Sequence, residues 1–361
     1  MTINRKRLID TFFDLLRVDS VSGNEAALAA HLARLLSQLG ATVRPDVRGN
    51  LLAFFDGRGA PILLSAHLDT VASTSTLKVV VENDVVSSDG STILGADDKA
   101  GIAALIEAMR YLAETGAPRP PVELALTVGE EVGLAGSKSL DFTSIRARRG
   151  VCVDSGGEVG TIITEGPAQV FLNAVVRGLA AHAGVAPERG ISAIVVASEA
   201  IAGMSLGRID EETTANVGVI SGGSATNVVP ERVEIKAEAR SRNEAKLKTQ
   251  YESMIDSLER AAARHGASVA VDVEHAYAAF KLSPQEGIVR LVSDACLAVG
   301  LSPRLEATGG GSDANIFNER GIMTVNLGVG YKDPHAVTER IAIADLVAIT
   351  GIVAEILSRA S

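Results

Sequence analysis

The stretch Gly90-Ser-Thr-Ile-Leu-Gly95-Ala-Asp97-Asp98-Lys-Ala-Gly101 places two adjacent carboxylates after a glycine-rich loop, at the start of a predicted helix. The N-terminal end of a helix attracts anions. Two neighbouring carboxylates repel each other, however, so we expect a cation beside them. Asp97 is therefore our candidate for the centre of a two-metal site. The simpler interpretation is that one aspartate only caps the helix, and the pair alone does not decide between the two.

The composition is that of a large, acidic chain with few aromatic residues. At 361 residues it is long enough for a sizeable core and two domains, and 47% of its residues are hydrophobic. A net charge of -10, aromatics at 3% and the lack of Trp argue against a nucleic-acid surface. No apolar run is long enough to span a bilayer, no signal-peptide pattern is present, and Cys152 and Cys296 give no disulfide framework. We therefore expect a cytoplasmic protein without nucleic-acid or membrane partners.

Strands and helices alternate along residues 1–166. Continuous apolar runs at 61–66 and 122–128 are typical of strands buried on both faces, and a further strand is expected at 150–153. A helical pattern at 98–114 lies between them. This alternation indicates an α/β sheet with helices on both faces, and the polar clusters follow strand ends, where open α/β sheets place their sites.

The pattern changes over residues 167–283. The expected order there is strand, helix, strand, strand, helix, strand, which is the split βαβ pattern of ferredoxin-like domains. The ranges are 168–177, 191–204, 215–221, 232–240, 243–264 and 268–277. Because the α/β pattern resumes in residues 284–361, we interpret 167–283 as an α+β domain inserted into the first.

Seven polar residues at these positions form a candidate metal centre: His67, Asp69, Asp97, Glu130, Glu131, Asp154 and His335. Zinc sites take imidazole and carboxylate ligands, and two zinc ions ~3.5–4 Å apart need a bridging carboxylate. The set supplies two histidines, a bridge, further carboxylates and one glutamate left over as a base. Asp69 is expected to accept a hydrogen bond from the His67 imidazole and fix its tautomer. Each residue alone fits a packed histidine or a turn or helix cap, but their joint placement favours metal binding.

Three helix caps are also predicted near these residues. Ser22-Gly-Asn-Glu25 has the capping-box pattern and predicts a helix over 24–39. Asp98 is expected to cap the helix over 98–114, and Asp313 a short helix after a glycine loop. These side chains would then have local structural roles and would not contact metal.

The motifs resemble those of the M20 metallopeptidases, and within them the tripeptidase T-like branch. The resemblance covers essentially the whole chain and implies a mixed-sheet catalytic domain of zinc-peptidase type (1–166 and 284–361) with a lid and dimerisation domain (167–283). It rests on seven segments in the expected order: Ser65-Ala-His-Leu-Asp69-Thr, Gly95-Ala-Asp-Asp98-Lys-Ala-Gly, Thr127-Val-Gly-Glu-Glu131-Val-Gly-Leu, Val153-Asp154, Gly178-Leu-Ala-Ala-His-Ala-Gly184, Thr226-Asn-Val-Val-Pro230 and Asp333-Pro-His335.

The resemblance implies which side chains bind two divalent ions, zinc by expectation. His67 and Asp154 would hold one ion, and Glu131 and His335 the other. Asp97 would bridge them, with a cis peptide bond to the following aspartate. Cobalt or manganese also suits such ligands.

The implied activity is hydrolysis of amide bonds in short peptides, as an aminopeptidase of the tripeptidase type. Glu130 would act as the general base on a water that bridges the metals, and would then pass the proton to the leaving amine. His182 of the lid would stabilise the oxyanion, and in dimeric relatives it comes from the neighbouring protomer. A homodimer through the lid is implied as well.

Five further residues are expected to position the substrate: Asn227, Arg240, Gly310, Gly311 and Ser312. The Arg240 guanidinium suits a peptide carboxylate, and glycine lets main chain come close to a ligand. The simpler interpretations are an ordinary surface arginine and, for His182, a loop histidine.

Two other functions stay open at this point. An N-acyl-amino-acid deacylase or desuccinylase would use the same ligands and differ only in its pocket. A non-catalytic metal-binding paralogue is disfavoured by Glu130, since such a site has no need of a free base.

Overall fold

The computed structural model describes residues 2–360, which divide into two compact units. The first comprises the residues up to Thr164, Lys281–Ala307 and the residues from Ser312 onward. The second comprises Glu165–Phe280 and Thr308–Gly311. The glycine loop, which the sequence placed with residues 284–361, therefore lies with the second unit up to Gly311.

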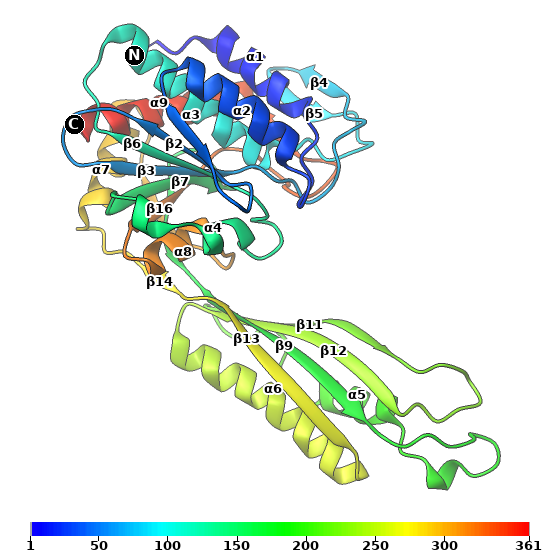
Figure 1. Ribbon diagram of the computed structural model, residues 1–361. Coiled ribbons are helices and arrows are strands. Elements are labelled where there is room, and N and C mark those ends of the chain that lie inside the picture. The colour runs from blue at the N-terminus through cyan, green and yellow to red at the C-terminus, as the bar shows by residue number, and fades with distance from the viewer. Residues whose placement is uncertain (1, 361) are drawn as a thin grey trace. The chain divides into compact units, whose positions relative to one another are not determined.

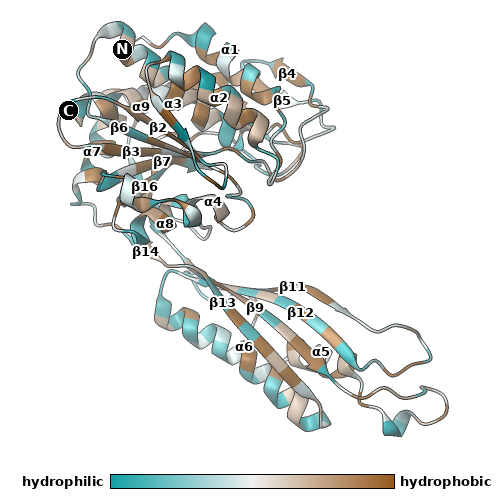
Figure 2. Ribbon diagram, in the orientation of Figure 1, coloured by the Kyte–Doolittle hydropathy of each residue, from teal (hydrophilic) through white to brown (hydrophobic). Residues whose placement is uncertain are grey.

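The first unit is built on one large mixed sheet. Its strands are β1 (Thr42–Pro45), β2 (Leu51–Phe55), β3 (Ile62–His67), β6 (Val122–Thr127), β7 (Arg149–Ser155), β8 (Thr161–Gly166), β14 (Phe280–Lys281), β15 (Arg304–Ala307) and β16 (Met323–Gly328). The order is β1-β2-β6-β3-β7-β16-β8-β14, with β15 beside β8. β3 is parallel to β6 and β7, whereas β2 is antiparallel to β6. β3 and β6 are buried along their whole length and consist mostly of apolar residues (Figure 2).

Helices cover both faces of this sheet, so the predicted α/β class is confirmed. They are α1 (Arg5–Leu16), α2 (Ala26–Gln38), α3 (Ala96–Thr115), α4 (Ala135–Ser139), α7 (Gly287–Ala298), α8 (Asp313–Glu319) and α9 (Ile343–Arg359), with a 3-10 turn at Phe142–Ser144. Figure 1 shows α3 and α9 on one side of the sheet and α4 and α8 on the other. Ile106 of α3 and Ile352 of α9 lie in the same core as the strands. Of the helices in residues 2–360, none has the length and apolar character to cross a bilayer.

A small second sheet in this unit was not predicted. It consists of β4 (Val79–Glu82), β5 (Val85–Ser88) and β17 (Arg340–Ala342), in the order β17-β5-β4. Asn83 and Asp84 have φ angles of 51° and 61°, so they form the kind of two-residue hairpin turn that favours Asn and Asp. β17 attaches the residues after His335 to this hairpin.

The second unit is an antiparallel sheet with two helices on one face (Figure 1). Its elements are β9 (Ala168–Arg177), α5 (Ala193–Ala202), β10 (Gly207–Arg208), β11 (Thr213–Gly222), β12 (Arg232–Ser241), α6 (Glu244–His265) and β13 (Ser268–Tyr277), with a 3-10 turn at Pro187–Arg189. The strand order is β10-β11-β12-β9-β13. Val196 and Leu258 of the helices pack against Val176 and Ile235 of the sheet. Burial alternates along β12 because only one face is covered.

Candidate metal centre

Three neighbouring strands bring four of the predicted residues to one edge of the large sheet. His67 ends β3, Asp154 lies near the end of β7, and Glu130 and Glu131 follow β6. β3 is parallel to both β6 and β7, so their carboxyl ends meet at this edge. The clustering therefore follows from the strand pattern.

Asp97 lies between the two histidines. Its Oδ1 is 3.0 Å from Nε2 of His67, and its Oδ2 is 3.3 Å from Nε2 of His335. Asp97 and Asp98 depart from helical φ and ψ at the start of α3, and the peptide bond between them is cis, as predicted. One carboxylate thus reaches both sides of the centre.

Two groups of possible ligand atoms share Asp97. The first is His67, Asp97 and Asp154, with His67 Nε2 3.4 Å from Asp154 Oδ1. The second is Asp97, Glu131 and His335, with His335 Nε2 2.8 Å from Glu131 Oε1. Within each group, the ligand atoms lie within 4.8 Å of one another. Each group could therefore hold one cation, and Asp97 is the carboxylate that the two groups share.

Glu130 belongs to a third group, with His67 and Glu131. Its backbone amide donates to Asp69 Oδ1 over 2.9 Å, and that of Glu131 donates to Asp69 Oδ2 over 3.2 Å. Nδ1 of His67 is 3.0 Å from the Asp69 carbonyl oxygen and 3.5 Å from its carboxylate. Asp69 therefore holds the Glu-Glu segment as well as the imidazole, which is more than the sequence predicted.

The predicted capping box before α2 is wrong. The α2 helix begins at Ala26 with no side-chain cap among the described residues. The Ser22 hydroxyl donates to Asp69 Oδ2 over 2.7 Å, and Glu25 Oε1 accepts from the amides of Gly23 and Gly129 over 2.9 and 3.1 Å. Ser22 therefore holds Asp69, and Glu25 holds the backbone just before the Glu130-Glu131 pair. Both side chains thus support the metal centre.

The prediction that Asp98 caps α3 is also wrong. Its side chain is fully buried, and Oδ2 accepts a hydrogen bond from the His67 amide over 3.2 Å. Oδ1 has no hydrogen-bond partner within residues 2–360, and burial raises the pKa of this carboxyl. The cap position belongs to Gly95, whose φ is 77°.

Asp313 is not the cap of α8 either. Ser312 and Asn315 form a capping box there, and the Ser312 hydroxyl accepts from the amide of Ala314 over 3.3 Å. The Asp313 carboxylate is buried and accepts a hydrogen bond from the Thr127 hydroxyl. It therefore adds a further negative charge beneath the strand ends.

The electrostatics of the centre favour cations. Burial raises the pKa of Asp154 to about 7, and burial together with the charge of Asp154 raises the pKa of Glu130. Hydrogen bonds to Asp97 and Glu131 raise the pKa of His335 to about 10. Crowded carboxylates beside two imidazoles are the donor set that zinc and similar ions bind. The residues present therefore fit a pair of divalent metals.

Glu339 is a site residue that the sequence did not reveal. Its carboxylate is fully buried and accepts the backbone amides of Gly95 over 2.7 Å and Asp97 over 2.9 Å. Burial raises its pKa to about 7. No local pattern signals this role, because the two amides that it accepts belong to residues 244 and 242 positions earlier.

A family model described as peptidase family M20/M25/M40 matches residues 63–359. This chain belongs to the M20 peptidases. It is 41% identical to the aminopeptidase PepT of Bacillus cereus ATCC 10987 (TM-score 0.91, 99% of each chain). It is 38% identical to a tripeptidase of Staphylococcus aureus subsp. aureus Mu50 (TM-score 0.95, 100% of this chain and 99% of that one). It is also 43% identical to the uncharacterized protein YqjE of Bacillus subtilis (strain 168), over 99% of this chain and 100% of that protein.

Membership makes this M20 peptidase a hydrolase of the metallopeptidase kind, as the sequence predicted. The predicted lid residues lie in its second unit. His182 is exposed and pairs with Val228, and the Ala183 amide donates to the Asn227 carbonyl over 2.9 Å. The loops that carry His182 and Asn227 are therefore adjacent within this unit.

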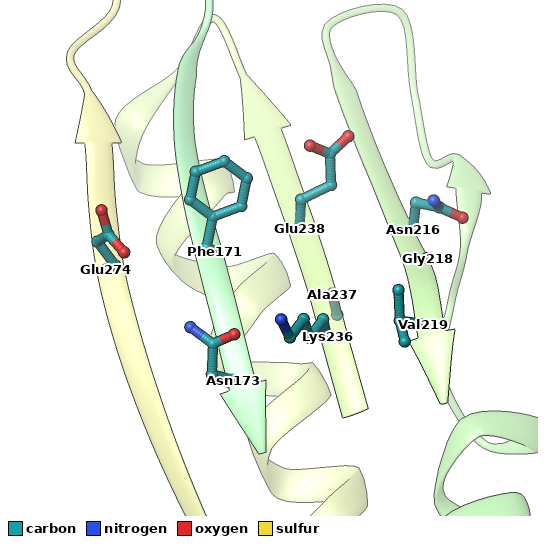
Figure 3. Close-up of a pocket in the computed structure, with 9 residues that line it drawn as sticks. All are labelled: Phe171, Asn173, Asn216, Gly218, Val219, Lys236, Ala237, Glu238 and Glu274. Carbon is teal, nitrogen blue, oxygen red and sulfur yellow. The ribbon is translucent and has the colours of Figure 1, made fainter. Parts of the chain in front are cut away.

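Arg240 of the M20 peptidase lies on the sheet face away from the helices. One face of this sheet carries a hollow of about 530 Å³ (Figure 3), lined by Phe171, Asn173, Asn216, Gly218, Val219, Lys236, Ala237, Glu238 and Glu274. Arg240 Nη2 donates to Glu238 Oε2 over 3.0 Å. On the adjacent strand β9, Gln169 lies opposite Arg240.

Gly311 lies against the ring of Tyr277. A Cβ at Gly311 would be 2.2 Å from Cζ and from the hydroxyl oxygen of Tyr277, so no larger residue fits there. A Cβ at Gly310 would make an ordinary contact, 3.7 Å from the Thr308 hydroxyl oxygen. Gly311 is thus required by its contact with Tyr277 within the second unit, and the approach of this glycine loop to a substrate stays a prediction.

Proposed function

We propose that this M20 peptidase hydrolyses short peptides as an aminopeptidase of the tripeptidase type, with two zinc ions and Glu130 as the general base. The observation that carries the proposal is Asp97, whose two oxygens lie 3.0 and 3.3 Å from the two histidines. The names of two solved relatives, an aminopeptidase and a tripeptidase, support the substrate class.

Five side chains would hold the metals. His67 and Asp154 would bind one ion, Glu131 and His335 the other, and Asp97 both. When bound, the two ions would lower the pKa of a water molecule and polarise the scissile carbonyl. Cobalt and manganese remain alternatives to zinc, since the same donors accept them.

Glu130 would move the proton. It is half-buried near His67, and the hydrogen bond from its backbone amide to Asp69 fixes its position. As the adjacent Glu131 faces His335 over 2.8 Å, Glu130 is the glutamate left for acid–base work. It takes a proton from the attacking water and delivers it to the leaving amine.

The second unit would recognise the substrate. His182 would stabilise the oxyanion, and Asn227, on the adjacent loop, would help to position the scissile bond. Arg240 would bind the peptide carboxylate by charge-assisted hydrogen bonds. Gly310, Gly311 and Ser312 would let main chain approach the substrate backbone.

A homodimer through the second unit is part of the proposal. Within residues 2–360, β10 pairs with Thr214 and Ala215 of β11, and the rest of that edge of β11 has no strand beside it. Val219 and Ile220 on this edge are 49% and 48% exposed. Open strand edges pair readily with another chain. We place this dimer in the cytoplasm, because both cysteines are free and buried.

Hydrolysis of a peptide panel tests the proposal. Tripeptides, acetyl-amino acids and succinyl-amino acids would be offered to the zinc-loaded protein, and released amino acids measured. Tripeptides should be cleaved fastest. If no tripeptide is cleaved with added zinc while an acylated amino acid is, the deacylase alternative replaces this proposal.

A further inference from the structure

Glu339 links two segments that carry candidate metal ligands. It lies four residues after His335, and its buried carboxylate accepts the amides of Gly95 and Asp97 over 2.7 and 2.9 Å. Each of its oxygens therefore accepts one backbone donor, one from the residue that precedes α3 and one from the first turn of that helix. A buried carboxylate with two such partners is fixed in position.

Besides Glu339, the segment that carries His335 is held by turns within it, by the Ser88 hydroxyl, which donates to the Val337 carbonyl over 3.2 Å, and by backbone pairing at its ends. Lys332 and Arg340 pair through their backbones, with N to O distances of 2.8 and 3.1 Å. His335 itself has a φ of 65°, and its side chain is 50% exposed. Its position therefore depends on whatever fixes this segment near Asp97.

Two of the three ligands of the other group are held differently. His67 and Asp154 lie on adjacent strands of the large sheet, with side chains 2% and 8% exposed. The hydrogen bonds of the sheet fix them without any help from Glu339. Loss of the Glu339 carboxylate should therefore disturb the two groups unequally.

The charge of Glu339 also has a partner. Lys99 is fully buried, its Nζ donates to the Val18 carbonyl over 2.7 Å, and it interacts with the charges of Glu339 and Asp19. A carboxylate at position 339 thus has a cation in its surroundings, although burial still raises its pKa to about 7.

We propose that Glu339 is a positioning residue, which sets the distance between His335 and the shared carboxylate of Asp97 and thereby the affinity for the metal ion at His335. The inference rests on the proposed function, because it assumes that these side chains bind two metals. It adds a residue that contacts neither ion and acts through backbone amides.

The test is metal binding by Glu339→Gln, measured without any activity assay. Glutamine keeps the shape but offers one acceptor oxygen, so one of the two amides loses its partner. Zinc affinity would be measured by competition with a chromogenic chelator, and stoichiometry by elemental analysis. We expect the weaker-bound ion to lose roughly 10–100-fold in affinity, as is typical when a residue that orients a ligand is changed, and the other ion to change little.

Glu123→Gln is the matched control. Glu123 is also a buried carboxylate with two backbone partners: its Oε2 accepts the amides of Arg146 and Ala147, each over 2.9 Å, and its Oε1 accepts from the Arg146 guanidinium over 3.1 Å. Its substitution should lower thermal stability without changing either zinc affinity. Should Glu339→Gln fail to fold, Glu339→Asp, which keeps the charge but shortens the reach, is measured in its place.

The outcomes separate this inference from the proposed function. Wild-type protein that binds no zinc overturns the proposed function. Wild-type protein that binds two ions, together with a Glu339 variant that binds both as tightly or loses both equally, overturns only the inference. An equal loss of affinity in Glu123→Gln also overturns it, since the effect would then be general destabilisation.

Discussion

The backbone amide of Glu130 donates a hydrogen bond to the carboxylate of Asp69 over 2.9 Å. The same aspartate contacts the His67 imidazole through its carbonyl oxygen, at 3.0 Å from Nδ1. A proposed metal ligand and the proposed base are therefore held by one residue. Asp69 thus sets the distance between them, through its main-chain carbonyl on one side and its carboxylate on the other.

Asp69→Asn should reduce peptidase activity without unfolding the chain. An amide cannot accept from Ser22 and from the amides of both glutamates as a carboxylate does, so we expect kcat to fall roughly 10–100-fold. Ser22→Ala removes only one of these bonds and should cost about threefold or less. Steady-state kinetics on one tripeptide compares the two variants; equal losses would contradict the role given to Asp69.

Glu130→Gln and Glu131→Gln should both lose peptidase activity, but for different reasons. Without a base at position 130, we expect kcat to fall roughly 10²–10⁴-fold while two zinc ions remain bound. Without Glu131, the group that includes His335 loses a ligand, and we expect bound zinc to drop. Elemental analysis of both purified variants measures the bound zinc. The assignment of Glu130 as the base and Glu131 as the ligand is wrong if Glu130→Gln is the variant that loses metal.

Without metal, stability should fall as pH rises. The pKa of Asp154 is raised from its ordinary 3.8 to about 7, and that of His335 from 6.5 to about 10. Both groups bind their protons more tightly in the folded chain than in the unfolded one, so alkali removes this contribution to stability.

We therefore expect the Tm of chelator-treated protein to fall between about pH 5 and about pH 9. Saturating zinc should raise Tm at pH 8, since a ligand present at 100 times its Kd contributes about 2.7 kcal/mol. Asp154→Asn should flatten the pH profile of the metal-free form. Calorimetry that finds a rising profile would refute the electrostatic description of the centre.

Arg240→Ala should discriminate between substrates with free and amidated carboxyl termini. Hydrogen bonds to a charged group are worth about 1.5–3 kcal/mol, so KM for a free tripeptide should rise roughly 10–100-fold, with little change for its amide. Arg232→Ala, on the same strand and paired with Glu234, is the control and should alter neither. A uniform rise in KM for both substrates would mean that Arg240 is structural.

The strand pattern predicted the centre because it fixes where the ligands emerge. Apolar runs ending at His67, at the Glu-Glu pair and at Asp154 must become adjacent once the strands align in parallel. Asp97 is then the predicted bridge between the metals, because two cations that lie close together need a shared carboxylate.

The supporting residues could not be predicted in the same way. Ser22 and Glu25 match a capping box over three residues, but their actual partners lie 47 and 104 residues away. Glu339 reaches a loop 242 residues earlier. Such long-range partners depend on tertiary packing, which a local pattern does not contain. The hairpin at Asn83 and Asp84, in contrast, carried a local signal that was overlooked.

The half-exposed side chain of His335 has a consequence for how the enzyme loses and regains metal. Water or a chelator can reach and displace the His335 imidazole without disrupting the sheet. His67, in contrast, lies on the buried strand β3. The ion at His335 should leave fast and the other slowly, so purified enzyme would carry one retained ion and one that dilution removes. Activity in the cell would then follow the free concentration of a single exchangeable metal.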